Sequence, residues 1–385
     1  MNIESISATN YKNLALDQVP LQPVTLVMGE NGVGKSNLLQ LIHILFQKKE
    51  PIEGAGVQFP LDGLVADDDL IRRGKTDGEA SVLVTTDSDV FRAAWRAFPN
   101  FPEPYTKKVT LKFRFWREVK GTAFKLSDLT FGSTHVHGEK EKEPKIPEEA
   151  LRKVQDWLEQ ELRDCTVYIP TNRLPSRTSV PYSSQAKVTA VTNLENTILR
   201  LLSDPHANQA EMDAIQDTLS TFFGIVDIRS TLGMKQLTPG ETFLPPPGMS
   251  PDGQDPQSVS DIKVGVRVRE KNKEWFELDK VGSGLQQVLV IITMLIQNRA
   301  RIALLEEFDS SLSPSRRSDM LEHLIRLTGR KKVISQLITT THGAFRYPNP
   351  RPLGLGPAPL ANGTVDFFPV NKKFWKQHTL VDTKF

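Results

Sequence analysis

Residues 29–36, Gly29-Glu30-Asn31-Gly32-Val33-Gly34-Lys35-Ser36, follow the pattern G-x-x-x-x-G-K-[ST] of a phosphate-binding P-loop. The apolar run Val24–Met28 precedes this loop and predicts a buried strand. Residues 37–45 follow it and predict a helix. The motif needs a strand, a glycine-rich loop and a helix in this order, because the loop presents backbone N–H groups to phosphates at the helix N-terminus. The stretch therefore predicts a nucleotide-binding α/β fold.

Each residue type in this loop has a physical task. Glycine lets the backbone turn its N–H groups inward, where bulkier residues would be blocked. The lysine reaches the β- and γ-phosphates, and the serine hydroxyl ligates the accompanying Mg²⁺. We therefore expect Lys35 to act in catalysis and Ser36 to ligate the metal. The expected nucleotide contacts in the loop are Asn31, Gly32, Val33, Gly34, Lys35, Ser36 and Asn37.

The composition is that of a folded protein without disulfides. Of the 385 residues, 38% are hydrophobic and 24% are charged, which is enough apolar material for a core. The net charge of +2 gives no argument for nucleic-acid binding from bulk charge, so any basic surface must be local. One cysteine, Cys165, excludes a disulfide framework within the chain and fits a reducing, cytoplasmic setting. We see no signal peptide and no membrane-spanning run, since the longest apolar stretch, 288–296, is too short.

Hydrophobic spacing predicts several elements between the two ends of the chain. Residues 107–119 alternate strictly and predict a half-buried strand whose outer face carries Lys108, Lys112 and Arg114. That face is either solvated or in contact with DNA phosphates. The predicted helices are 147–163, 187–202 and 210–223, the predicted loops are 132–147 and 240–260, and the predicted hairpin joins 262–268 to 275–278.

Residues 10–14 lie between two predicted strands, 3–9 and Val24–Met28. In P-loop enzymes such a segment lies beside the base and the α-phosphate, which would make Lys12 a nucleotide contact. A plain polar turn is an equal alternative, and both interpretations stay open.

A second group of ligand-binding residues is predicted between 281 and 342. Gly282-Ser283-Gly284 opens a strongly apolar helix, and such a turn is an anion site. The buried strand 301–305 ends in Glu306 and Glu307, where a parallel α/β sheet binds its ligands. Because successive strand residues point to opposite sides, we assign Glu306 to Mg²⁺ and Glu307 to activation of the attacking water.

The next predicted strand, 333–341, ends in His342. An imidazole at a strand end can hydrogen-bond a γ-phosphate or the attacking water. We therefore expect Glu307, His342 and Lys35 to form the catalytic group.

This order of motifs resembles the ABC-type ATPase head of the SMC/RecF/OLD branch. The stretches that carry the resemblance are 8–14, 29–39, 304–307 and 338–342, and they bracket nearly the whole chain. The resemblance implies an α/β fold of the ABC-type P-loop NTPases, with a mixed central sheet, an antiparallel β subdomain and a short helical insertion. It implies an N-terminal lobe over 1–145, the helical insertion over 146–235 and a C-terminal lobe over 236–385.

The resemblance also implies ATP hydrolysis, with ATP and Mg²⁺ as cofactors, and assembly of a homodimer or higher homo-oligomer through the ATP sites. Two heads of this class sandwich two ATP molecules. Ser283 and Gly284 would then contact the γ-phosphate held by Lys35 of a second copy, and Asp309 would lie at the seam.

The chain shows no SMC arm, no transporter signature and too few residues after His342 for a Toprim nuclease. It therefore resembles stand-alone ATPase subunits of bacterial anti-phage defence systems, which regulate a separately encoded effector such as a nuclease or toxin. Two alternatives stay open: a RecF-like DNA-binding ATPase in DNA repair, and a scaffold that senses ATP without hydrolysing it.

Overall fold

The computed structural model describes residues 1–47, 49–52, 61–85, 108–131, 134–137, 162, 166–171, 180–181, 198, 201–202, 209–234, 262–297, 301–329, 333–342 and 352–370. The chain forms two compact units, Met1–Thr171 with Arg299–Phe385, and Asn172–Asn298. The P-loop and the segment from Glu306 to His342 belong to the first unit. The Gly-Ser-Gly turn belongs to the second.

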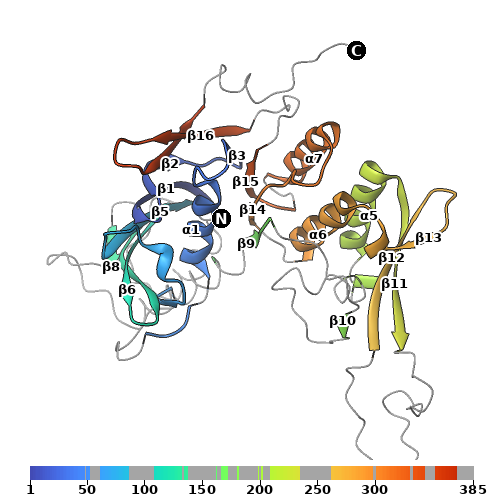
Figure 1. Cartoon of the computed structure of the whole chain (residues 1–385), viewed down its shortest axis with the longest axis horizontal. Coiled ribbons are helices and arrows are strands. Elements are labelled where there is room, and N and C mark those ends of the chain that lie inside the picture. Colours follow the sequence, from blue (N-terminus) through green and yellow to red (C-terminus); the bar gives the residue numbers. More distant parts are fainter. Residues whose placement is uncertain are drawn as a thin grey trace, which may run out of the picture. The chain divides into compact units, whose positions relative to one another are not determined.

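The first unit is built on one mixed sheet of 13 strands, drawn mainly in blue, teal and red in Figure 1. The strands are β1 Asn2–Tyr11, β2 Leu14–Pro20, β3 Val24–Met28, β4 Gly63–Val65, β5 Asp77–Thr85, β6 Lys108–Glu118, β7 Gly121–Phe131, β8 Thr134–His137, β9 Thr166–Ile169, β14 Ile302–Leu305, β15 Gln336–Thr341, β16 Leu353–Pro359 and β17 Val365–Pro369. Their order is β4-β7-β6-β5-β1-β2-β17-β16-β3-β15-β14-β9, and β8 pairs with β7. Helices α1 (Lys35–Phe46) and α7 (Pro314–Leu327) and the short 3-10 helix η1 (Asp68–Leu70) belong to the same unit.

The parallel half of this sheet places the ends of four strands along one edge. Strands β9, β14, β15 and β3 run parallel to their neighbours. Leu305 lies opposite both Thr339 and Ile169, and Thr341 lies opposite Met28. The segments that follow these strands therefore emerge together, which is where a parallel sheet binds its ligands. They carry the P-loop, the two glutamates and His342.

The antiparallel half confirms the alternation predicted for 107–119. In β6 the side chains on the inner face are fully buried: Val109, Leu111, Phe113 and Phe115. Lys108, Lys112 and Arg114 occupy the outer face. Period-two spacing works here because a strand turns alternate residues to opposite sides of the sheet.

The described residues of the second unit form a small antiparallel sheet and two long helices. Its elements are β10 Val180–Pro181, α5 Gln209–Phe223, β11 Ile225–Met234, β12 Ile262–Glu270, β13 Trp275–Glu277, the 3-10 helix η4 Leu278–Lys280 and α6 Ser283–Gln297. The sheet order is β10-β12-β11, and β13 pairs with β12, as the predicted hairpin requires. Helix α5 buries Met212, Ile215 and Leu219 at the predicted helical spacing, and it packs on β11 and α6.

The fold class predicted from the sequence is confirmed: a large mixed central sheet with a separate small antiparallel sheet. Some element predictions were wrong. Residues 134–137 form strand β8 instead of part of a loop, because they pair with β7. The stretch between the first two predicted strands contains β2, so the turn is reduced to Lys12 and Asn13. Strands β4, β7, β10, β11, β16 and β17 were not predicted.

Parts of the predicted elements lie outside the described residues. They are most of the loop 132–147, the helix 147–163 except Leu162, most of the helix 187–202, and the loop 240–260. None of the helices in the described ranges is long and apolar enough to cross a membrane.

Candidate functional site

The P-loop leaves strand β3 and enters helix α1 through three glycines with positive φ. The φ angles are 142° at Gly29, 78° at Gly32 and 96° at Gly34. Gly34 is the N-cap of α1 in a left-handed conformation, and a Cβ there would lie 3.0 Å from Asn13 Oδ1. A side chain at this position is excluded both by the backbone angle and by the close approach of the β1–β2 turn. The loop conformation thus explains why glycine precedes Lys35 in the motif.

Lys35 is the buried cation of the loop. Its ammonium donates to the carbonyl oxygens of Gly29 at 2.8 Å and Glu30 at 2.6 Å, and it lies 3.0 Å from His342 Nδ1. These three acceptors match the three N–H donors of a protonated lysine. Burial lowers the pKa of Lys35, and the carboxylate of Glu307 opposes that shift. The ammonium is therefore held at the base of the loop by two backbone carbonyls and one imidazole nitrogen.

His342 joins Lys35 to Glu307. An ammonium only donates, so Nδ1 of His342 is the acceptor, and its Nε2 carries the proton in a neutral ring. Nε2 lies 2.7 Å from Glu307 Oε1 and donates to it. The two hydrogen bonds fix the tautomer and the plane of the imidazole.

Glu307 has a left-handed backbone conformation, with φ of 41°, which is strained for a residue with a side chain. Its N–H donates to the hydroxyl of Thr340 at 2.8 Å, across from the adjacent strand β15. The turn sends the carboxylate towards His342. Local strain of this kind gathers at functional sites, because the surrounding structure must hold it in place.

A second polar cluster lies directly beyond Glu307. Asp309 is 3% exposed, and its Oδ2 accepts a hydrogen bond from the hydroxyl of Thr341 at 2.7 Å. Arg317, in the first turn of α7, approaches the same oxygen at 3.9 Å and donates through Nε to the carbonyl of Leu312 at 2.9 Å.

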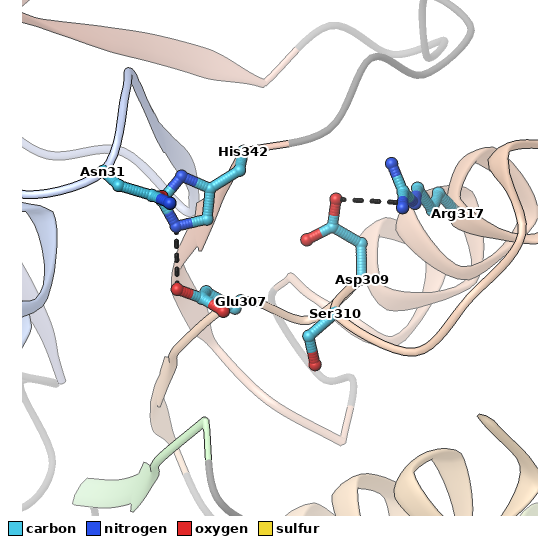
Figure 2. A pocket seen from close by; sticks show the side chains of 6 residues that line it. All are labelled: Asn31, Glu307, Asp309, Ser310, Arg317 and His342. Atoms are coloured by element: carbon cyan, nitrogen blue, oxygen red, sulfur yellow. Dashed lines mark hydrogen bonds and ion pairs between the residues drawn. The ribbon is translucent and has the colours of Figure 1, made fainter. Parts of the chain in front are cut away.

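These groups surround a pocket of about 300 Å³. Figure 2 shows the six side chains that line it and the contacts from His342 to Glu307 and from Asp309 to Arg317. The lining residues are Asn31, Glu307, Asp309, Ser310, Arg317 and His342. The volume is at the lower end of the range for small-molecule sites, about 300–1,000 Å³, and suits the phosphate end of a nucleotide.

Glu306 turns to the opposite neighbour, strand β9. It is 8% exposed, and its Oε2 accepts hydrogen bonds from the Thr171 hydroxyl at 3.1 Å and the Thr171 N–H at 3.3 Å. Tyr168 is also hydrogen-bonded to Glu306, and burial followed by the charge of Glu306 raises the pKa of the Tyr168 phenol. The His43 ring of α1 stacks on Tyr168 with centroids 4.6 Å apart. Glu306 is thus connected to the helix that follows the P-loop.

The predicted metal ligands fit a magnesium ion shared with phosphates. Ser36 is exposed at the start of α1, and Glu306 is a carboxylate fixed by Thr171 at the end of β14, which is separated from β3 by strand β15 alone. Mg²⁺ usually takes one or two protein oxygens and completes its shell with water and substrate phosphates. In the described ranges no cluster of three or more His, Cys, Asp or Glu side chains could hold a metal ion by itself.

Other predicted residues have different surroundings. Lys12 donates to Gln40 Oε1 of α1 at 2.8 Å, so the turn is tied to the helix. Asn37, also in α1, donates to Asn13 Oδ1 of the same turn at 2.8 Å. Ser283 is exposed at the start of α6 in the second unit.

Sequence reasoning missed the threonines and the arginine of the site. Thr171, Thr340 and Thr341 follow or end buried strands that neighbour β14, so strand order is needed to associate them with the glutamates. Arg317 could have been found from the sequence. A basic residue in the first turn of a helix is unusual, because its charge opposes the helix dipole.

The comparisons with known proteins concern the family and the fold. A family model described as an AAA ATPase domain matches residues 1–195, just over half of the 385 residues. No curated protein matches the sequence. A solved structure of an SMC head bound to the C-terminal winged-helix domain of ScpA has a TM-score of 0.51 at 12% identity and covers 98% of this chain and 100% of its own.

Two further structures are similar over nearly the full length with lower scores. One is an Smc head domain with an extended coiled coil bound to the C-terminal domain of ScpA from Pyrococcus furiosus, with 12% identity, a TM-score of 0.47 and coverage of 97% of this chain and 98% of its own. The other is the recombination mediator protein RecF-ATPrS, with 12% identity, a TM-score of 0.46 and coverage of 95% of this chain and 98% of its own.

Proposed function

We propose that this chain, which belongs to the AAA ATPase domain family, binds ATP at its P-loop and hydrolyses it. The observation that supports this most is the hydrogen-bonded series from Lys35 through His342 to Glu307, which joins the P-loop to a carboxylate across one pocket. A purely nucleotide-binding site needs the lysine but not a histidine and a strained glutamate beside it.

Each of the three residues has one task in the proposed reaction. Lys35 leaves the carbonyls of Gly29 and Glu30 and contacts the phosphates. Glu307 accepts a proton from a water molecule while the water oxygen attacks the γ-phosphorus, and ADP leaves with the bridging oxygen. His342 donates through Nε2 to Glu307 Oε1 and so holds the carboxylate in the pocket. Ser36 and Glu306 are the proposed ligands of Mg²⁺, which neutralises phosphate charge when bound.

We further propose that ATP joins two copies of the chain. Ser283 and Gly284 would contact the γ-phosphate held by a second copy, with Asp309 at the seam. This arrangement is supported by the resemblance to two-headed ATPases.

Phosphate release tests the proposal directly. The wild-type protein with Mg²⁺ and ATP is expected to release phosphate well above the level of a Lys35→Ala sample, and to shift from monomer to dimer in light scattering with a non-hydrolysable ATP analogue. ATP binding without any turnover would leave the non-hydrolysing scaffold as the function. Turnover by a protein that stays monomeric at saturating analogue would contradict the shared-site model.

The cellular role that we propose is control of a separately encoded effector, a nuclease or toxin, in anti-phage defence. Its support is the sequence resemblance to stand-alone ATPase subunits of such systems. Co-purification of the native operon products with and without ATP tests it: an effector protein retained in a nucleotide-dependent manner is expected. Recovery of the ATPase alone under both conditions would contradict it.

The DNA-binding alternative depends on the outer face of β6, and its charges are balanced. Lys108 pairs with Glu4 at 2.6 Å, Lys112 with Asp128 at 3.2 Å, and Arg114 with Glu79 at 3.7 Å. A phosphate backbone would have to replace these carboxylates. A salt-dependent duplex affinity that is lost in Lys112→Glu with Arg114→Glu would favour this alternative.

A further inference from the structure

Arg317 lines the pocket, yet the reaction proposed above gives it no task. Its side chain is 27% exposed, and its contacts in the described residues are made by Nε. Nε donates to the Leu312 carbonyl at 2.9 Å and lies 3.9 Å from Asp309 Oδ2, which is too far for a hydrogen bond. The terminal N–H groups of the guanidinium therefore have no hydrogen-bond acceptor in the part of the chain that the structure describes.

The local electrostatics do not explain an arginine at this position. Arg317 lies in the first turn of α7, which holds no acidic residue. The N-terminus of a helix carries a partial positive charge, so a cation there is unfavourable for folding. A break of a local rule without a folding benefit is typical of a functional position.

Asp309 does not accept a hydrogen bond from the Arg317 guanidinium. A structural arginine–carboxylate pair is usually bidentate, with two parallel N–H···O bonds. Here the buried Asp309 accepts from Thr341 instead, at 2.7 Å, and attracts the guanidinium only at longer range. Figure 2 shows the guanidinium directed towards Asp309, with the pocket residues His342 and Glu307 beyond. The carboxylate and the Leu312 carbonyl thus hold the guanidinium in place and leave most of its donors available.

We propose that Arg317 is an anion-binding residue that receives a phosphate group in this pocket. The inference rests on the proposed function, because the same pocket contains His342 and Glu307. A guanidinium suits this ligand, since its planar set of donors matches two oxygens of a phosphate. The phosphate group is either the terminal phosphate of bound ATP or the inorganic phosphate left after hydrolysis.

Three variants test the proposal: Arg317→Gln, which removes the charge, Arg317→Lys, which keeps it without the planar donors, and Arg316→Gln as a matched control. Arg316 is exposed on the same turn of α7 and does not line the pocket. Calorimetry with Mg²⁺ measures three affinities: for ADP, for a non-hydrolysable ATP analogue, and for inorganic phosphate added to the ADP-loaded protein. Thermal unfolding confirms that each variant is folded.

Arg317→Gln is expected to keep its ADP affinity and to lose about tenfold or more in one of the two phosphate-dependent affinities. A loss for the ATP analogue identifies the terminal phosphate as the ligand, and a loss for free phosphate identifies the product. Arg317→Lys is expected to lie between wild type and Arg317→Gln, and Arg316→Gln to match wild type.

If folded Arg317→Gln keeps wild-type affinity for both the ATP analogue and inorganic phosphate, the proposal is overturned. The proposed function is unaffected by that result as long as ADP still binds. Loss of dimer formation with both phosphate arms unchanged would also overturn it, because the ligand would then be an acidic group of a second copy. If the wild type binds no ADP, the proposed function itself fails.

Discussion

The imidazole of His342 donates to Glu307 Oε1 at 2.7 Å while its other nitrogen accepts from Lys35 at 3.0 Å. One ring therefore connects two motifs more than 270 residues apart in the sequence. The contact depends on strands β3, β15 and β14 lying side by side, since each residue follows one of them. Substitution of Glu307, at the far end of this series from Lys35, should therefore separate nucleotide binding from turnover.

Replacement of Glu307 by glutamine should stop hydrolysis without preventing binding. The amide oxygen still accepts from His342 Nε2, so the pocket keeps its shape, but an amide cannot take a proton from water. We expect phosphate release to fall by about 10²- to 10⁴-fold, with ATP affinity close to wild type and more ATP-bound dimer in light scattering. Turnover near the wild-type rate would show that another group is the base.

Lys35→Ala should abolish nucleotide binding. The ammonium is the buried cation of the loop, and charge-assisted hydrogen bonds to phosphates are among the strongest in proteins. We expect ATP affinity to fall at least about tenfold, measured by calorimetry. Unchanged affinity would mean that the P-loop does not hold the nucleotide.

Lys12→Ala separates the two interpretations of the 10–14 turn. Lys12 donates to Gln40 Oε1, a contact that fixes the turn on α1. If this contact is the whole role of Lys12, ATP affinity should stay within about twofold of wild type, because the lost hydrogen bond then stabilises the turn and not the nucleotide. A loss comparable with that of Lys35→Ala would instead place the turn beside the nucleotide.

The sequence was sufficient for elements whose residue pattern is local. Strand β6 has strict alternation, and β3 and β14 are apolar runs, so their type and burial follow from the pattern. Strand β16, Leu-Gly-Leu-Gly-Pro-Ala-Pro, reads as a loop because glycine and proline disfavour strands. It forms a strand through its parallel pairing with β3, which no local pattern shows.

The same limit applies to the site. The P-loop, the two glutamates and His342 carry motifs, and their strands end along one edge of the sheet. The side chains that hold these residues in place carry no motif. Thr340 in β15 accepts from the Glu307 N–H, and Thr171, just after β9, donates to the Glu306 carboxylate. The strained backbone of Glu307 is likewise imposed by its neighbours and has no signature in the sequence.

Gln336 should be a strong stabiliser of the sheet. It is 1% exposed in β15, and its amide donates to the carbonyls of Ile3 at 2.7 Å and Gln22 at 3.1 Å and accepts from the Ile3 N–H at 2.7 Å. Gln336→Leu removes these partners of the Ile3 N–H and the Ile3 carbonyl, and leaves the Gln22 carbonyl with the Thr25 hydroxyl at 3.2 Å. We expect the free energy of unfolding to fall by about 2–4 kcal/mol in urea titrations.

The matched control for this variant is Gln22→Ala, which removes an exposed side chain and keeps the Gln22 carbonyl. It should change the free energy of unfolding by no more than about 0.5 kcal/mol. Equal effects of the two substitutions would show that the buried amide contributes no more than an exposed one.

His43 should make the fold sensitive to acid. Burial, with a smaller contribution from Lys49, lowers the pKa of His43 from its ordinary value of 6.5 to about 4. Between these two values the unfolded chain binds a proton that the folded chain does not, so the free energy of unfolding decreases as the pH falls from about 6.5 to about 4. A shift of this size corresponds to about 3 kcal/mol.

His43→Phe should remove that part of the acid sensitivity. Phenylalanine keeps an aromatic ring on Tyr168, where the imidazole now stacks, and it has no proton to bind. Urea titrations at pH 7.5, 6.5, 5.5 and 4.5 (values chosen to span the window) should show the two proteins diverging below pH 6.5, with the wild type losing more stability. Because all other titrating groups are shared, their contributions cancel in the difference. Two curves that stay parallel down to pH 4.5 would show that His43 is protonated equally in the folded and unfolded chain.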